Sequence, residues 1–153
     1  MKAACAIIAM VPAILSGCRA DRGGHVESGS IRISHAVIPA PFGGAEVSAF
    51  FVVTNRGDSA ITLVATRSPA ADSTLLHEVA GGQMRRVLNV GIPAHGRLLL
   101  APGGYHLMLQ GLRHPLALGD TVTLELTFDP GGSVTVRIPV LRYTDAVSEL
   151  PAH

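Results

Sequence analysis

The segment TVTLELTFDPGGSVTVRIPV, residues 121–140, decides the fold class. Apolar residues occupy every second position of its first half, namely Val122, Leu124, Leu126 and Phe128. The same alternation returns from Val134 to Val140, after the five-residue connection Asp129-Pro-Gly-Gly-Ser133. A period of two is typical of a strand with one buried face, and a short Gly-rich connection is typical of a hairpin. The segment therefore predicts two antiparallel strands.

Similar short apolar stretches occur on the N-terminal side, separated by Gly- and Pro-containing turns at intervals of about ten residues. We expect further strands at 31–37, 48–54, 60–67, 73–79, 84–90, 97–100 and 105–109. No segment has the pattern of an amphipathic helix, and no internal repeat is present. Many short strands with regular turns predict one all-β domain over residues 31–142, an antiparallel β-sandwich with Greek-key connections, followed by a short C-terminal tail at 143–153.

Composition excludes several classes of function. The only lysine is Lys2, and eleven arginines balance eleven acidic residues, so the chain lacks the basic surface of a nucleic-acid binder. Both cysteines, Cys5 and Cys18, lie at the far N-terminus. The predicted domain therefore has no thiol for a disulfide, a zinc knuckle, a nucleophile or a blue-copper electron-transfer site. No Gly-x-Ser-x-Gly element or comparable nucleophile–base set is present, and we expect no enzyme activity.

The N-terminus has the pattern of an export signal. Lys2 is followed by an apolar segment from Ala3 to Leu15, which is too short for a typical membrane-spanning helix. Leu15-Ser-Gly-Cys18 resembles a bacterial lipobox, so we expect residues 1–17 to be removed and Cys18 to be lipidated. Residues 18–30 are polar and rich in Gly and Ser, which predicts a flexible tether. Arg19 follows the cysteine, and this favours attachment to the outer membrane, facing the periplasm.

Two His/Met pairs are candidate metal ligands. His106 and Met108 are two residues apart on a predicted strand, so both side chains should lie on the same face. His77 and Met84 flank Gly81-Gly82, a hairpin signal that would bring them together. Thioether sulfur is a soft, uncharged ligand that favours Cu(I) over hard cations, and imidazole binds copper in either oxidation state.

The spacing of these residues resembles the periplasmic copper chaperone family known as PCuAC. In that family a His and a downstream Met are followed by twenty-one residues and then His-x-Met. Here Met84 is followed by twenty-one residues and His106-Leu-Met108. The resemblance extends over about 31–141 and includes the segments Asn55-Arg-Gly-Asp58, Ser68-Pro-Ala70, Leu76-His-Glu78 and Pro102-Gly-Gly-Tyr-His-Leu-Met-Leu109.

The resemblance implies a cupredoxin-like sandwich that carries one Cu(I) ion on His77, Met84, His106 and Met108. It also implies a copper acceptor as partner, such as the dicopper centre in subunit II of cytochrome c oxidase or a Sco-type protein. The other histidines match no position of the motif, and we expect none of them to be a ligand: His25, His35, His95, His114 and His153. The alternative is a metal-free, lipid-anchored sandwich that binds a protein partner.

The connection between the first His and Met departs from the family pattern. Six residues separate His77 from Met84, where the family commonly has ten, and Val79 stands where an additional Met is frequent. A turn at Ala80-Gly81, or a loop at Val79–Gly82, would place His77 directly opposite Met84 on one face of the hairpin. The loss of four residues is an even change, so it preserves the face on which each side chain lies.

We predict that Cys18→Ser abolishes labelling of the chain by a clickable fatty acid and leaves uncleaved precursor, because the lipidated thiol would be missing. Cys5→Ser is the matched control and should keep the label, since Cys5 lies in the predicted signal peptide. Equal labelling of the wild type and Cys18→Ser would contradict the lipid anchor.

Overall fold

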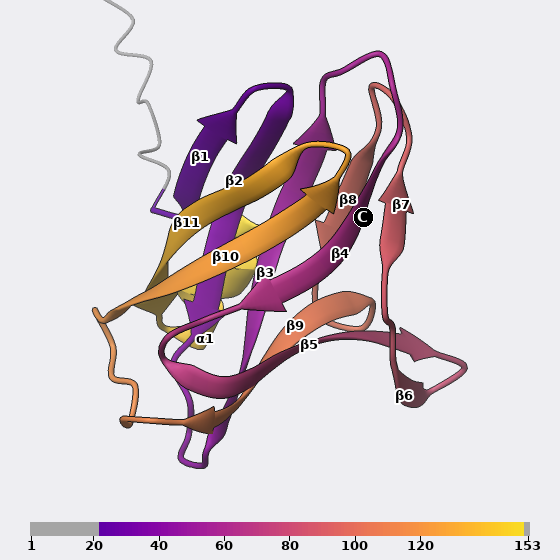
Figure 1. The fold of residues 1–153 in the computed structure, drawn as a ribbon. Coiled ribbons are helices and arrows are strands. Elements are labelled where there is room, and N and C mark those ends of the chain that lie inside the picture. Colours follow the sequence, from indigo (N-terminus) through magenta and orange to yellow (C-terminus); the bar gives the residue numbers. More distant parts are fainter. Residues whose placement is uncertain (1–21, 152–153) are drawn as a thin grey trace, which may run out of the picture.

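A computed structural model describes residues 22–151 as a β-sandwich with one short helix (Figure 1). The elements are β1 (Gly24–Ser28), β2 (Ile31–Pro39), β3 (Glu46–Asn55), β4 (Ile61–Arg67), β5 (Ala71–Ala80), β6 (Gln83–Arg86), β7 (Val90–Ile92), β8 (Arg97–Leu100), β9 (Tyr105–Leu112), β10 (Thr121–Asp129), β11 (Gly132–Leu141) and α1 (Tyr143–Glu149). The all-β, single-domain fold predicted from the sequence is confirmed. The predicted signal peptide and Cys18 lie outside the described residues.

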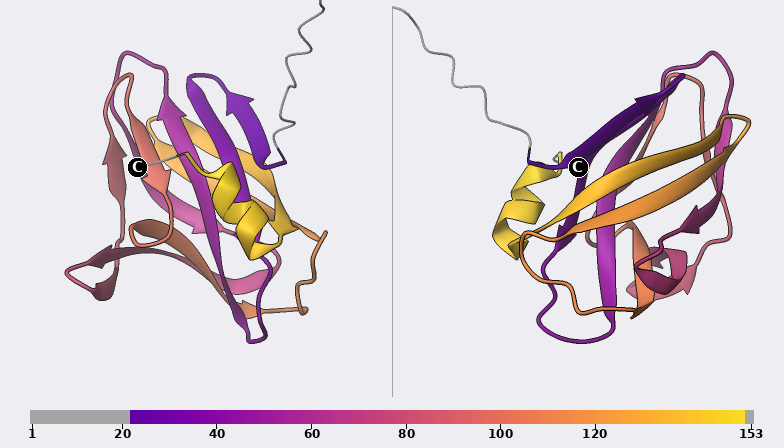
Figure 2. Two further views of the ribbon diagram at one scale, coloured as in Figure 1. Left: turned by 180° about the vertical axis from the view of Figure 1, so that it is seen from behind. Right: turned by 60° about the vertical axis from the view of Figure 1, so that its left-hand side comes forward.

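The strands follow one another in the order β6-β5-β9-β8-β3-β2-β11-β10-β4-β7, and β1 pairs with β2. The sheet folds over at the contact between β2 and β11, which pair in parallel through only two residue pairs. The result is two packed layers, with β4, β7, β10 and β11 in one and the remaining strands in the other (Figures 1 and 2). Apart from β2–β11 and a single β8–β9 pair, the described pairings are antiparallel.

The core lies between the layers and is built from the alternating positions. In the β10–β11 hairpin, Leu124 pairs with Val136 and Leu126 with Val134, and all four side chains are buried. On the facing layer, the alternate residues Leu107 and Leu109 of β9 are completely buried. Burial of one such side chain favours folding by about 1.5–3 kcal/mol. The core therefore fixes which face of β9 points outward.

Three segments differ from the sequence prediction. Residues 24–28 of the predicted tether form β1, because Gly29 takes a positive φ of 57° and turns the chain back so that Val26 packs partly against the core. Residues 143–149 of the predicted tail form α1, which buries Ala146 against Val37 and Phe50 on the outer face of β2 and β3 (Figure 2). The strand expected at 84–90 is divided into β6 and β7.

This division has a topological cause. The short strand β6 pairs with β5 in one layer, whereas β7 pairs with β4 in the other. Residues 87–89 carry the chain across the open side of the sandwich between them. The predicted strand is interrupted because its two ends pair with strands of different layers.

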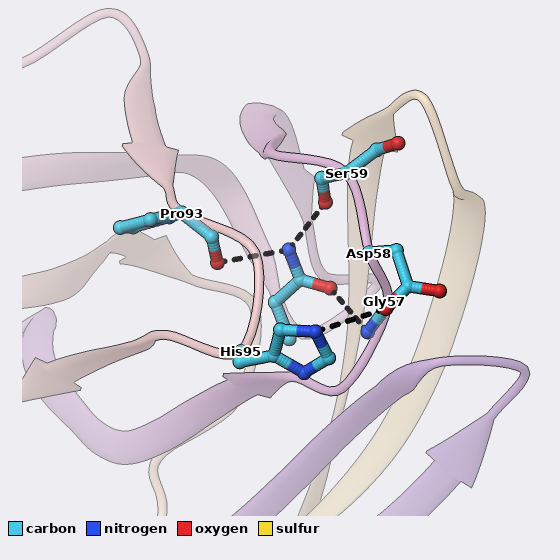
Figure 3. A network of polar contacts seen from close by, with 6 residues as sticks. Gly57, Asp58, Ser59, Pro93 and His95 are labelled. Atoms are coloured by element: carbon cyan, nitrogen blue, oxygen red, sulfur yellow. Dashed lines mark hydrogen bonds and ion pairs between the residues drawn. The ribbon is translucent and has the colours of Figure 1, made fainter.

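A buried amide fixes the end of β3 to the loop that follows β7 (Figure 3). The side chain of Asn55 is fully buried, and its Nδ2 donates to the carbonyl oxygens of Ser59 and Pro93 at 2.8 and 3.0 Å. Its Oδ1 accepts a hydrogen bond from the backbone N–H of Gly57 at 3.0 Å. Asn55 is the first residue of the Asn55–Asp58 segment described above, and its role is to stabilise the fold.

We predict that Asn55→Ala lowers the free energy of unfolding by about 2–3 kcal/mol, because it leaves buried backbone groups without partners. Urea unfolding followed by circular dichroism measures this change. Asp58→Ala in the same loop is the control and should have little effect, since the His95–Asp58 pair is exposed. Equal destabilisation by the two substitutions would contradict the assigned role of Asn55.

No helix in the described range 22–151 combines the length and the apolar character that a membrane span requires.

Candidate metal centre

The pairing of β5 with β9 places two histidines side by side. In the antiparallel register His77 lies directly opposite His106. Their rings stack, with the centroids 5.8 Å apart and the planes inclined by 24°. Residues directly opposite each other project from the same face of a sheet. Since Leu107 and Leu109 fill the core, this face is the outer one.

Met108 lies on the same outer face, two residues along β9 from His106, as the sequence predicted. It is opposite Leu75 of β5 and Ser48 of β3. His106 is only 5% exposed, while Met108 is half-buried. The His106/Met108 pair thus lies on a central strand of the layer, with a paired strand on each side.

The predicted pairing of His77 with Met84 is wrong by two residues. Gly81 and Gly82 both take left-handed conformations, with φ values of 59° and 75°, and form the two-residue turn themselves. Val79 therefore pairs with Met84, and His77 pairs with Arg86. A shift of two preserves the face, so Met84 still lies on the side of His77, as its diagonal neighbour.

The position of Met84 differs from that of the other three residues. The strand β6 is the last of its layer, and the β5–β6 hairpin projects from the body of the sandwich (Figure 1). The Met84 side chain is 53% exposed. The structure therefore gathers His77, His106 and Met108 on two central strands and places Met84 at the sheet edge beside them.

Hydrogen bonding sets the orientation of the His106 ring. Its Nδ1 lies 3.1 Å from the carbonyl oxygen of Gly104. A carbonyl can only accept, so Nδ1 carries the proton and Nε2 of the neutral ring keeps its lone pair. Metal-bound histidines commonly donate their second nitrogen to a backbone carbonyl in this way. His106 is thus prepared to act as a ligand through Nε2.

The environment of His77 keeps its imidazole neutral. Burial lowers its pKa, and electrostatic repulsion from His106 and Arg86 lowers it further, while a backbone contact with Leu75 and the charge of Glu46 oppose the lowering. Nδ1 of His77 is buried, and within residues 22–151 it makes no hydrogen bond of good geometry. A neutral ring with an unsatisfied nitrogen is suited to metal coordination.

Within the described part of the chain, no cluster of three or more His, Cys, Asp or Glu side chains could hold a metal ion. A metal at the His77/His106 pair would therefore depend on the thioethers. Of the remaining histidines, His95 bonds Asp58 at 2.9 Å in a distant loop, and His153 lies outside the described residues. Neither joins the candidate site.

Three further residues, not expected from the sequence, lie beside the candidate site. Arg86 lies opposite His77, and Glu46 and Gln110 face each other across β3 and β9 beside Met108. Their proximity depends on the register of strands far apart in the sequence. Of the three, only Gln110 had a signal in the sequence. Its position two residues after Met108 on a predicted strand places both side chains on the same face, but this spacing does not show that the two side chains interact.

Comparison with known proteins agrees with the sequence resemblance. Residues 31–140 match the family model described as "LpqE-like: Putative lipoprotein LpqE-like". A curated relative, "Putative lipoprotein Lxx21020" of Leifsonia xyli subsp. xyli (strain CTCB07), is 34% identical over 125 residues, which cover 78% of this chain and 75% of the relative.

Solved structures of similar fold include two copper-bound proteins. The copper-bound PCuAC domain from PmoF2 has a TM-score of 0.68 and 26% identity, covering 77% of this chain and 97% of that domain. The Cu(I) form of DR1885 from Deinococcus radiodurans has a TM-score of 0.61 and 33% identity, covering 71% of this chain and 76% of that protein. The resemblance to PCuAC domains stated from the sequence is confirmed.

We predict that the imidazole of His77 titrates below its ordinary pKa near 6.5 in the metal-free protein. His106→Ala should raise this pKa, because it removes both the burial of His77 by the neighbouring ring and the electrostatic repulsion between the two imidazoles. NMR titration of the histidine ring protons measures the pKa of His77 in the wild type and in His106→Ala. An unchanged pKa of His77 in His106→Ala would contradict the close contact of the two rings.

Proposed function

Because the chain belongs to the LpqE-like lipoprotein family, we propose that it is a lipid-anchored copper(I) chaperone that carries one Cu(I) ion on His77, Met84, His106 and Met108. The observation that best supports this proposal is the outer-face cluster, in which two stacked imidazoles and the thioether of Met108 lie on paired strands. The copper-bound structures of related domains give the second support.

The donor set suits copper in its reduced form. Two imidazoles and two thioethers carry no charge, and thioether sulfur prefers the soft Cu(I) ion. The cluster contains no thiolate that could be oxidised to a disulfide. Hard cations such as Mg²⁺ require oxygen ligands, and none of the four proposed ligands has one in its side chain. We therefore propose Cu(I) as the cargo.

The open position of the cluster suits transfer rather than chemical conversion. A hollow of about 740 Å³ lies between β4, β5 and β10, and none of the four proposed ligands lines it. They lie on the outer face of the sheet, where His106 is buried, His77 and Met108 are half-buried, and only Met84, at the edge, is exposed. We propose that an acceptor approaches this edge and replaces Met84 first, while His77, His106 and Met108 still hold the ion.

Our proposals for the membrane anchor and for the partner are supported by the N-terminal sequence and by the family. We propose that Cys18 is lipidated and that the chain faces the periplasm from the outer membrane. The segment between Cys18 and β1 is short, so the sandwich would stay close to the bilayer. We propose a copper-accepting protein as partner, either subunit II of cytochrome c oxidase or a Sco-type protein.

We predict that the purified domain binds one Cu(I) ion, and that His106→Ala and Met108→Ala each weaken binding at least tenfold, about 1.4 kcal/mol. Met84→Ala should weaken it less, because Met84 is exposed at an edge strand. Titration against a chromophoric Cu(I) chelator measures these affinities.

His95→Ala and His114→Ala are the controls, since both residues lie away from the cluster in exposed positions, and they should keep wild-type affinity. If the controls weaken Cu(I) binding as much as His106→Ala does, the site lies elsewhere. If the wild type binds no Cu(I), the chaperone proposal is wrong and the metal-free protein-interaction module takes its place.

A further inference from the structure

Two polar side chains beside the proposed ligands form a hydrogen-bonded chain that ends on the sulfur of Met108. Nε2 of Gln110 donates to Oε1 of Glu46 at 3.0 Å and to Sδ of Met108 at 3.4 Å. The register of β3 and β9 brings the three together, since Glu46 lies opposite Gln110 and Ser48 lies opposite Met108. All three side chains therefore project from the outer face.

The carboxylate determines which way the Gln110 amide points. An ionised carboxylate can only accept hydrogen bonds, so Gln110 must turn its NH₂ group, and not its oxygen, toward Glu46. The same NH₂ group has a second hydrogen, which faces the Met108 sulfur. If the amide turned over, its oxygen would meet two acceptors, and both contacts would become unfavourable.

A thioether side chain needs such a restraint more than an imidazole does. Methionine has three rotatable side-chain bonds and adapts easily to its surroundings. The Met108 side chain is half-buried on an open sheet face, so packing alone leaves it freedom. Within residues 22–151, no hydrogen bond reaches the sulfur of Met84 on the exposed edge strand, and the two methionines therefore differ in restraint.

We propose that Glu46 and Gln110 are positioning residues that hold the Met108 thioether in the orientation in which it binds the metal ion. Glu46 orients the Gln110 amide, and Gln110 holds the sulfur beside the two histidines before the ion arrives. Because the Met108 side chain is already held in place, it loses less conformational entropy when the ion binds. This inference rests on the proposed Cu(I) function and adds two residues that are not ligands.

Three variants can distinguish a positioning role of Glu46 from an effect of its negative charge. Glu46→Gln removes the charge but keeps an oxygen that can accept the hydrogen bond from Gln110. Glu46→Ala removes both the charge and the acceptor. Gln110→Leu removes the donor to the sulfur and keeps a side chain of similar size. The three variants therefore test the acceptor, the charge and the donor independently.

The experiment is NMR of the metal-free protein with ¹³C-labelled methionine methyl groups, combined with Cu(I) titration of the same variants. The methyl carbon shift reports the rotamer distribution about the bond next to the sulfur. We expect Glu46→Ala and Gln110→Leu to move the Met108 signal toward that of a freely rotating side chain and to leave the Met84 signal unchanged. Both variants should weaken Cu(I) binding about threefold to tenfold, the range expected for one hydrogen bond.

Glu46→Gln should keep most of the wild-type shift and affinity. An unchanged Met108 signal in Gln110→Leu would overturn the proposal, as would equal loss of affinity in Glu46→Gln and Glu46→Ala, which would assign the effect to charge. These outcomes differ from failure of the proposed function. In that case the wild type itself binds no Cu(I), and the methyl signals still show whether Gln110 orders Met108.

Discussion

The pairing of β5 with β9 is the constraint on which the candidate site depends. His77 and His106 are far apart in the sequence, and only this antiparallel register places them opposite each other. A slip of one residue would move one of the two rings to the core side of the sheet, where Leu76 and Leu107 now lie. The buried leucines of β9 thus fix the site as well as the core, because they determine which residues face outward.

The two edges of this cluster have different properties. On the β3 side, Met108 is half-buried and receives a hydrogen bond from Gln110. On the β6 side, Met84 belongs to the terminal strand of the layer and is more than half exposed. A carrier must hold its ion and also release it to a partner. In the proposed site, three ligands on paired strands would hold the ion while Met84, exposed at the sheet edge, is exchanged for a ligand of the partner.

The sequence predicted the sandwich and the His106/Met108 face correctly, because both follow from the local alternation of apolar residues. It failed where a distant contact decides the structure. Residues 24–28 have one apolar side chain and form a strand because β2 offers a partner, and the segment at 84–90 divides because its halves belong to different layers. The hairpin register was missed by two residues because Gly81 and Gly82 both entered the turn. The contact between Glu46 and Gln110 had no local signal, since it depends on the register of β3 and β9.

X-ray absorption spectroscopy of the Cu(I)-loaded domain tests the central claim most directly, because it counts the atoms bound to the metal. We expect two imidazole nitrogen and two thioether sulfur scatterers in the wild type. In Met108→Ala we expect one sulfur scatterer, with both nitrogen scatterers retained. A wild-type spectrum without sulfur, or with sulfur contributions unchanged in Met108→Ala, would contradict a site built on the outer face of β5 and β9.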